Sequence, residues 1–306
     1  MKSLRHLLTP LDAVSIGFLG LLIALCLVFA GRVEAWPILV ALDLGMVVLI
    51  VWLARKAHGH PTKLWTHLHR WYCYPFVLFV FRQLYYMVHP IHPTDYDTLF
   101  IAVDRWIFGV DPTVWLSRFT HPALTELLQT TYFAYYILFI VVGVGVYRRY
   151  PIREFDHAAF LIVYGFYLSY LGYFLLPAVG PRFTLHDFHA LTQELPGLWL
   201  TDTYRAIINA GESLHPNIPN PQDLVQRDMF PSGHTEMTLI CILLGFRYRL
   251  SARWFIAVVG TLLVFATVYL RYHYVIDLIG GAAFFGIAIW TGDRFQKWWS
   301  GEAEER

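Results

Sequence analysis

The segment from Pro231 to Thr235 places a histidine at an expected helix start. Its sequence, Pro-Ser-Gly-His-Thr, stands between a polar stretch and an apolar one. Ser232 is suited to cap the first turn, because a serine hydroxyl accepts a hydrogen bond from a free backbone N–H there. Gly233 would let an anion approach that turn closely, and the N-termini of helices bind phosphate. We expect His234 to face the same anion; a plain capping segment is the other interpretation.

His273 and Asp277 form a second pair that could do chemistry. They are four residues apart in Arg-Tyr-His-Tyr-Val-Ile-Asp, so on a helix they would share one face. Asp277 could accept a hydrogen bond from one ring nitrogen, which fixes the tautomer and turns the other nitrogen toward a substrate. Ionisable residues at the mouth of a membrane helix are costly and usually functional. The pair is therefore a candidate nucleophile with its orienting acid, and a structural hydrogen bond is the alternative.

Two arginines and two further polar residues are secondary candidates. Arg182 and Arg271 could bind phosphate oxygens, since a guanidinium group matches them in charge and geometry. Glu236 is expected near the site, and Arg82 interrupts an apolar stretch and could pair with Glu236 or line a headgroup pocket. His234 and Glu236 form a His-x-Glu string, but no cysteine pair or third ligand accompanies them. We therefore predict no metal and no cofactor.

The composition indicates that a membrane protein carries these residues. Of the 306 residues, 57% are hydrophobic and 15% are charged, whereas soluble domains average about 25% charged residues. The net charge of +1 gives no sign of a nucleic-acid partner. We therefore expect a polytopic, all-α membrane protein whose partners are the lipid bilayer and a lipid substrate.

Apolar stretches long enough to cross a membrane, about 20 residues each, are predicted at eight places. They lie near residues 11–30, 37–54, 73–89, 126–146, 158–178, 233–249, 254–271 and 274–292. With the N-terminus in the cytoplasm, fifteen Lys and Arg residues fall on the cytoplasmic side and seven on the outer side. Together with Arg82 inside a span, these account for all 23. This partition agrees with the positive-inside rule and puts both termini in the cytoplasm.

The same topology predicts one membrane domain over residues 1–306. Residues 1–125 would form N-terminal spans and an outer loop with interfacial helices, residues 126–292 the catalytic core, and residues 293–306 a cytoplasmic tail. A second outer loop, about 180–230, is long and polar, which is typical of a lid or a binding element. His234, His273, Asp277 and Arg182 all fall at outer ends of spans, so the site is expected on the extracytoplasmic side.

The combination of Pro-Ser-Gly-His with a later His-x-x-x-Asp resembles the type 2 phosphatidic acid phosphatase and haloperoxidase superfamily. The resemblance covers roughly residues 126–292 and implies a six-helix core within about eight transmembrane helices. It also implies that His273 attacks phosphorus and becomes a phosphohistidine, that Asp277 orients it and that His234 protonates the leaving group. Ser232 and Gly233 would contact the phosphate oxygens, and the family's phosphatases need no metal.

The arginines depart from the phosphatase pattern and point to another branch. Leu175 stands where the phosphatases' first motif has lysine, and Thr267 stands where their third motif has arginine. A shifted arginine before His-Tyr-x-x-Asp, and the string Asp-Arg-Trp-Ile-Phe-Gly from Asp104 to Gly109, look more like the inositol phosphorylceramide and sphingomyelin synthases. That branch transfers a phospho-headgroup between lipids. The acceptor is therefore open between water and a lipid or sugar alcohol.

Two classes of protein other than a phosphotransfer enzyme share some of these features. A transporter would also be polytopic, but it tends to show broken helices in two related halves, and we find no such symmetry. An intramembrane protease could use Ser232 with His273, yet its serine would need to lie at membrane depth. We predict a lipid phosphatase or phosphotransferase and keep headgroup transfer, and more distantly transport, as alternatives.

Overall fold

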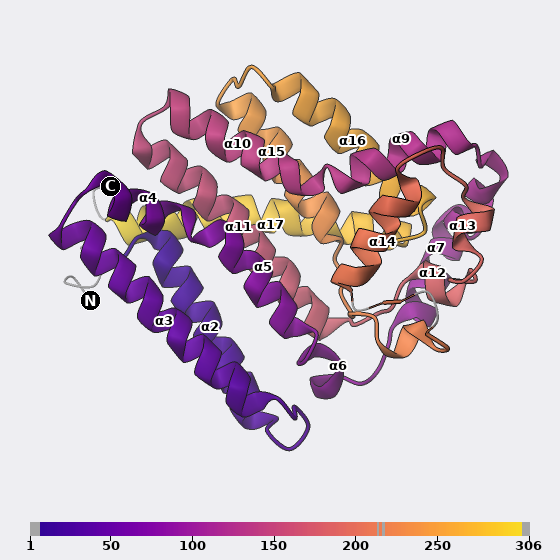
Figure 1. Cartoon of the computed structure of the whole chain (residues 1–306), viewed down its shortest axis with the longest axis horizontal. Helices are drawn as coiled ribbons and strands as arrows, with labels where there is room; N and C mark the ends of the chain where they lie inside the picture. Colours follow the sequence, from indigo (N-terminus) through magenta and orange to yellow (C-terminus); the bar gives the residue numbers. More distant parts are fainter. Residues whose placement is uncertain (1–6, 213, 216–217, 302–306) are drawn as a thin grey trace.

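The computed structural model describes residues 7–212, 214–215 and 218–301, and in these residues every regular element is helical (Figure 1). The first half of the chain contributes α2 (Pro10–Val28), α3 (Trp36–Gly59), α4 (Lys63–Trp71), α5 (Cys73–Leu84), α6 (Val88–Ile91), α7 (Asp97–Phe108), α8 (Pro112–Leu116), η1 (Ser117–Phe119), α9 (Pro122–Phe133) and α10 (Tyr135–Arg149). The second half contributes α11 (Ile152–Leu175), α12 (Pro181–Thr184), α13 (Leu191–Glu194), α14 (Thr201–Gly211), η2 (Pro221–Asp223), α15 (Gly233–Arg247), α16 (Arg253–Tyr269) and α17 (Val275–Ser300). The expectation of an all-α protein is confirmed for the described residues.

Several of these helices are long and apolar enough to cross a membrane. By length and composition α2, α3, α11 and α17 qualify, and α9 with α10 forms a fifth span if the 47° bend between them is counted within one span. The remaining predicted spans coincide with α5, α15 and α16, which have 12, 15 and 17 residues. At 1.5 Å per residue even α16 is only about 26 Å long, shorter than the ~30 Å hydrocarbon core. Helix length alone therefore supports four or five of the eight predicted spans.

The central helix of the bundle is α11. Two thirds of its apolar window is buried within the protein, against 28% for α17 and α3. It contacts α2, α5, α10, α15 and α17, whereas the α2–α3 hairpin lies to one side (Figure 1). A helix with neighbours on most sides is apolar around its circumference, as α11 is from residue 158 onward.

The start of α2 and the end of α17 lie at the same end of the bundle, where the indole of Trp299 donates to the Leu8 carbonyl at 3.0 Å. Helix α17 continues to Ser300, so most of the stretch that we assigned to a tail is helical. The short helices α7, α12 and α13 gather at the opposite end (Figure 1). Both predicted outer loops are therefore at one end, and this end carries the residues that could do chemistry.

Close packing of α15 against α17 joins the two sequence motifs. A Cβ atom built on Gly281 would lie 2.5 Å from the Ser232 carbonyl oxygen and 2.9 Å from Cβ of Thr235. The Ser232 N–H also donates to the Asp277 carbonyl at 2.9 Å. Glycine at this position therefore lets the start of α15 reach the first turns of α17.

We predict that Gly281→Ala lowers the free energy of unfolding by about 1–3 kcal/mol, because the added methyl group would overlap the backbone of α15. Thermal unfolding of the purified protein in detergent measures this. Gly286→Ala is the matched control in the same helix, since a Cβ there meets nothing within 4 Å. Equal unfolding midpoints for the two variants would contradict the close packing of α15 on α17.

Candidate active site

His273 lies in the turn between α16 and α17, two residues before α17 begins. Its Nδ1 donates to Asp277 Oδ2 at 3.2 Å, and the Tyr274 N–H donates to the same oxygen at 2.9 Å. The pair thus meets through the capping turn of α17, and the two residues do not share one helix face as we expected. Both side chains are buried. With Nδ1 engaged, Nε2 is the nitrogen left to face a substrate.

His234 faces that free nitrogen. Helix α15 begins at Gly233, and Ser232 caps it as predicted, its hydroxyl accepting from the Thr235 N–H at 3.2 Å. Nδ1 of His234 lies 3.4 Å from Nε2 of His273. The two histidines, which are 39 residues apart in the sequence, therefore form one dyad.

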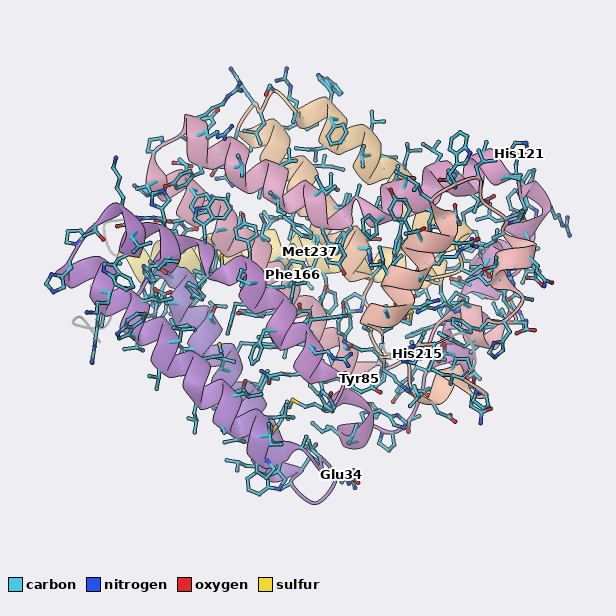
Figure 2. The ribbon with its side chains drawn as sticks, in the orientation of Figure 1. Glu34, Tyr85, His121, Phe166, His215 and Met237 are labelled. Carbon is cyan, nitrogen blue, oxygen red and sulfur yellow. The ribbon has the colours of Figure 1, made fainter. Side chains whose placement is uncertain are left out.

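The dyad opens into a mostly aromatic pocket with about 60 Å³ of free space. Phe166, one of the residues that line this pocket, lies in the middle of the bundle (Figure 2). His234 is stacked on Tyr132 and tilted against Tyr135, with ring centroids 4.7 and 4.4 Å away. Further lining comes from Leu78, Phe81, Tyr136, Tyr170, Tyr173, Met229, Gly233 and Tyr272. The free space beside the histidines is therefore small and bounded mainly by aromatic rings.

Two carboxyl groups of the second outer loop, Glu212 and Asp228, complete the lining. Burial, reinforced by the neighbouring Glu212 carboxylate, raises the pKa of Asp228 to about 8. Asp228 is therefore largely protonated at neutral pH, which reduces its repulsion of an incoming phosphate.

Arg182 lies next to the pocket but is already engaged. It forms an ion pair with Glu212, donates to Asn209 Oδ1 at 3.4 Å and is stacked between Phe183 and Tyr272, 4.8 Å from each ring. Its side chain is buried, and Gly180, with φ of 98°, forms the turn before it. Its Nε has no hydrogen-bond partner among the described residues, so Arg182 could meet a phosphate either through that nitrogen or by releasing Glu212.

The side chain of Arg271 is directed away from the pocket, toward α13. It forms an ion pair with Glu194 of α13 and donates to Ser117 Oγ at 3.2 Å, and it does not line the pocket. Its backbone has φ of 69°, a left-handed conformation that directs the chain into the His273 turn. The arrangement fits a structural role for Arg271 better than direct phosphate contact.

Glu236 and Arg82 are separated from each other. Glu236 is buried one turn into α15 and accepts from the Ser169 hydroxyl of α11. Arg82 lies at the outer end of α5, donates to the Gly211 carbonyl at 3.4 Å and contacts the Tyr85 ring. Arg82 thus touches the end of α14, beside Glu212, whereas Glu236 supports the start of α15 from behind.

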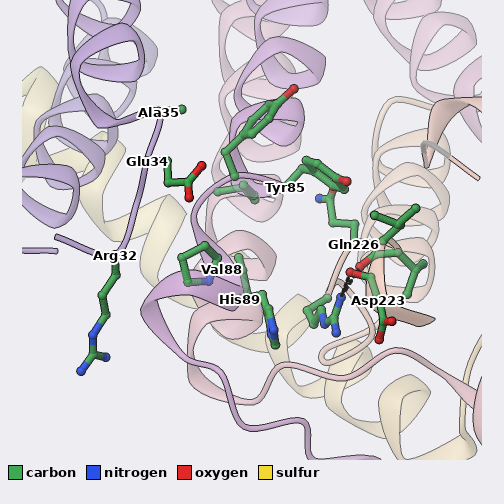
Figure 3. Close-up of a pocket in the computed structure, with 14 residues that line it drawn as sticks. Arg32, Glu34, Ala35, Tyr85, Val88, His89, Asp223 and Gln226 are labelled. Atoms are coloured by element: carbon green, nitrogen blue, oxygen red, sulfur yellow. Dashed lines mark hydrogen bonds between the residues drawn. The ribbon is translucent and has the colours of Figure 1, made fainter. Parts of the chain in front are cut away.

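A larger cavity of about 410 Å³ opens between the α2–α3 loop and the second outer loop (Figure 3). Glu34, His89, Asp223 and Arg227 are among the residues around it. His234 and His273 are not part of its lining. The candidate chemistry therefore belongs to the smaller aromatic pocket.

Comparison with known protein families shows to which superfamily the chain belongs. A family model described as the PAP2 superfamily matches residues 98–291, which is well over half of the chain and includes both histidines. The chain belongs to the PAP2 superfamily. The resemblance seen in the sequence is confirmed at this level, and the synthase-like branch stays a prediction. Comparisons with curated proteins and with solved structures gave no match.

PAP2 superfamily membership supports a phosphatase-type enzyme, and the matched range begins earlier than the motifs suggested. It starts at residue 98, inside α7, so the first outer loop is part of the family domain. In the described part of the chain no group of three or more His, Cys, Asp or Glu residues could hold a metal ion.

Four acidic residues near the site received no role from the sequence. Glu212 and Asp228 line the pocket, and Asp97 and Asp104 of α7 bond the elements that carry His273 and Arg182. Only Asp104 had a signal, since it begins the Asp-Arg-Trp-Ile-Phe-Gly string. The other three stand in stretches whose partners are distant in sequence.

The environment of His273 predicts an unusual titration. Burial of the ring, and then the nearby His234 and Arg182, lower the pKa of His273 well below its usual value of about 6.5. The ring should therefore stay neutral as the pH falls through 6.5 and lose this state only at lower pH. Site-resolved ¹⁵N NMR of labelled histidine measures the midpoint.

Arg182→Gln should raise that midpoint, because it removes a positive charge that disfavours the protonated ring. Arg271→Gln, which removes the arginine paired with Glu194, is the control and should leave it unchanged. A wild-type midpoint at or above 6.5 would contradict the buried dyad.

Proposed function

We propose that the protein is a membrane-embedded lipid phosphatase or phosphotransferase that works through a phosphohistidine on His273. Its substrate would be a phospholipid or a lipid phosphate or diphosphate, bound at the extracytoplasmic face. One observation carries the proposal: Asp277 holds Nδ1 of His273, while Nε2 faces Nδ1 of His234 at 3.4 Å in an enclosed pocket. This is the arrangement of a nucleophile, its orienting acid and a proton donor.

The proposed first step forms one bond and breaks one bond. The lone pair on Nε2 of His273 attacks phosphorus, and the bond from phosphorus to the leaving oxygen breaks. His234 gives its proton to that oxygen, so the leaving group departs as an alcohol, or as a lipid monophosphate where the substrate is a diphosphate. Asp277 stabilises the positive charge that develops on the His273 ring.

The second step reverses these roles. His234, now neutral, takes the proton of an acceptor hydroxyl while its oxygen attacks phosphorus and the P–N bond breaks. The dyad returns to its first state. Water as acceptor gives a phosphatase, and a lipid or sugar alcohol gives a transferase.

The phosphate oxygens would be held by the start of α15 and by Arg182. Ser232 and Gly233 stand where free backbone N–H groups and the helix dipole favour an anion. Arg182 would exchange Glu212 for the phosphate, a change between two anionic partners that keeps the guanidinium paired. Arg271 would have to leave Glu194 to take part.

Headgroup transfer between lipids is the second candidate. The mostly aromatic lining of the pocket favours an acceptor with an apolar part, such as a lipid alcohol, over water alone. The Asp104 string of the synthase-like branch also bonds the start of α17. A transporter remains the distant alternative.

The outer-face assignment has two supports. The distribution of Lys and Arg favours a loop-rich end on the outside, and the start of α2 meets the end of α17 at the other end of the bundle. Both chain termini would then be cytoplasmic.

A phospholipid labelled with ³²P in the headgroup phosphate should leave acid-labile, base-stable label on the wild-type protein and none on His273→Ala. Phosphoramidates hydrolyse in acid, whereas serine phosphate esters are acid-stable. Running the reaction with water alone, with diacylglycerol and with ceramide, and measuring free phosphate beside new lipids, identifies the acceptor. Label retained on His273→Ala would reject the proposed nucleophile. So would an acid-stable label on the wild-type protein that is absent from Ser232→Ala.

Glu212→Gln should lower the KM for the phosphorylated lipid by about tenfold, because the phosphate no longer competes with a charged carboxylate for Arg182. Asp202→Asn is the matched control. Asp202 lies in α14 and also pairs with an arginine, Arg205, but its side chain is 71% exposed. The inhibition constant of inorganic phosphate should fall in parallel. An increase in KM would mean that Glu212 orients Arg182 and does not compete for it.

A further inference from the structure

We propose that Asp97 and Asp104 of α7 are positioning residues that set the distance between the His273 nucleophile and Arg182. The inference rests on the proposed function, since it concerns how that nucleophile is aligned. Neither aspartate lines the pocket, so both would act through the elements that they bond.

Asp104 caps α17 from outside the helix. Its Oδ2 accepts from the Val275 N–H at 2.8 Å and its Oδ1 from the Ile276 N–H at 2.9 Å. These are the first two N–H groups of α17, which no carbonyl within the helix can satisfy. The side chain of Asp104 is buried, and a carboxylate at a helix N-terminus is favoured by the helix dipole.

That cap lies between the two residues of the nucleophilic pair. Val275 and Ile276 follow His273 and precede Asp277, so the two bonds fix the backbone through which the imidazole and its carboxylate are joined. A shift of this turn would change the direction in which Nε2 of His273 points. Asp104 therefore controls orientation without touching the reacting atoms.

Asp97 connects the turn that follows His273 with the turn that precedes Arg182. It accepts from the Val179 N–H at 3.0 Å, from the Gly180 N–H at 2.8 Å and from the Tyr274 hydroxyl at 2.7 Å. Gly180 begins the turn that leads to Arg182. One buried carboxylate thus connects the His273 loop with the start of α12.

Helix α7 is a suitable frame for both contacts. Asp97 and Asp104 are seven residues apart, about two turns, so they project from one face. Leu99 and Trp106, each two residues after one of the aspartates and so on the opposite face, are 47% and 85% exposed, as expected of a helix that lies in the membrane interface. A frame held by the membrane on one face and by the site on the other can keep two loops at a fixed separation.

The test compares Asp104→Asn and Asp104→Ala with the wild type in the full-length protein reconstituted into vesicles. We expect kcat to fall about a hundredfold in Asp104→Ala, the scale of a misplaced reacting group, with KM within about twofold. Asp104→Asn should be intermediate, because its amide oxygen can still accept one of the two bonds. Asp97→Asn should lower kcat and raise KM, because it disturbs the Arg182 turn as well.

Two inhibitors separate alignment from a general loss of structure. Orthovanadate resembles the five-coordinate transition state at the nucleophile, so its affinity should fall in parallel with kcat. A non-reactive phosphonate analogue of the lipid should bind Asp104→Asn and the wild type equally. Asp111→Asn is the control in the same loop, because Asp111 pairs with the exposed Arg105. It should leave kcat, KM and the affinities for orthovanadate and the phosphonate unchanged.

Wild-type kcat in Asp104→Ala would overturn the inference, and so would equal losses of vanadate and phosphonate binding in Asp104→Asn. If Asp104→Ala does not fold, the Asp104→Asn measurements decide alone. His273→Ala is run alongside: activity there rejects the proposed function, whereas an inactive His273→Ala beside a fully active Asp104→Ala rejects only the role of α7.

Discussion

Asp277 is the residue on which the rest of the candidate site depends, because it bonds both segments that carry the histidines. Its side chain accepts from His273 and from the backbone of Tyr274, and its own carbonyl accepts from the Ser232 N–H. The side chain therefore orients one histidine, and the backbone sets the start of the helix that carries the other. Burying a carboxylate is expensive unless it is hydrogen-bonded, and the two bonds to Oδ2 offset part of that cost, whereas the buried Oδ1 has no partner in the part of the chain that the structure describes.

Much of the surrounding structure serves to keep this junction closed. Gly281 allows α15 to approach α17, and aromatic rings cover the dyad. The charged groups nearby are arranged in pairs: Glu212 with Arg182 and Glu194 with Arg271. A phosphate in the pocket could meet Arg182 at its unpartnered Nε or by replacing Glu212, and the second course would couple substrate binding to movement of the second outer loop.

The sequence allowed candidate site residues to be proposed because each motif is local. Ser232 could be identified as a helix cap from its neighbours, and His273 and Asp277 from their spacing. The membrane setting followed from composition. Pairing of the motifs needed only the charge-based topology, which puts them at one end of the bundle.

Contacts between distant segments could not be predicted in the same way. Asp104 is 171 residues from Val275, and Asp97 is 177 from Tyr274, so no periodicity links them. The direction of the Arg271 side chain depends on its left-handed backbone. The bend between α9 and α10 contains no proline that would have predicted it from the sequence. The span predicted at 73–89 was too long for another reason, since hydrophobicity continues through the turn after Leu84 where the helix ends; α3 and α17, in contrast, extend beyond their predicted spans.

The most direct test of the central claim is to identify which nitrogen carries phosphorus in the trapped enzyme. Because Asp277 occupies Nδ1 of His273, the account predicts phosphorylation at Nε2, which ³¹P NMR and tandem mass spectrometry of the phosphopeptide distinguish from the Nδ1 isomer. Phosphorus on Nε2 of His273 would support the assigned geometry. Phosphorus on Nδ1, or on any residue other than His273, would contradict it.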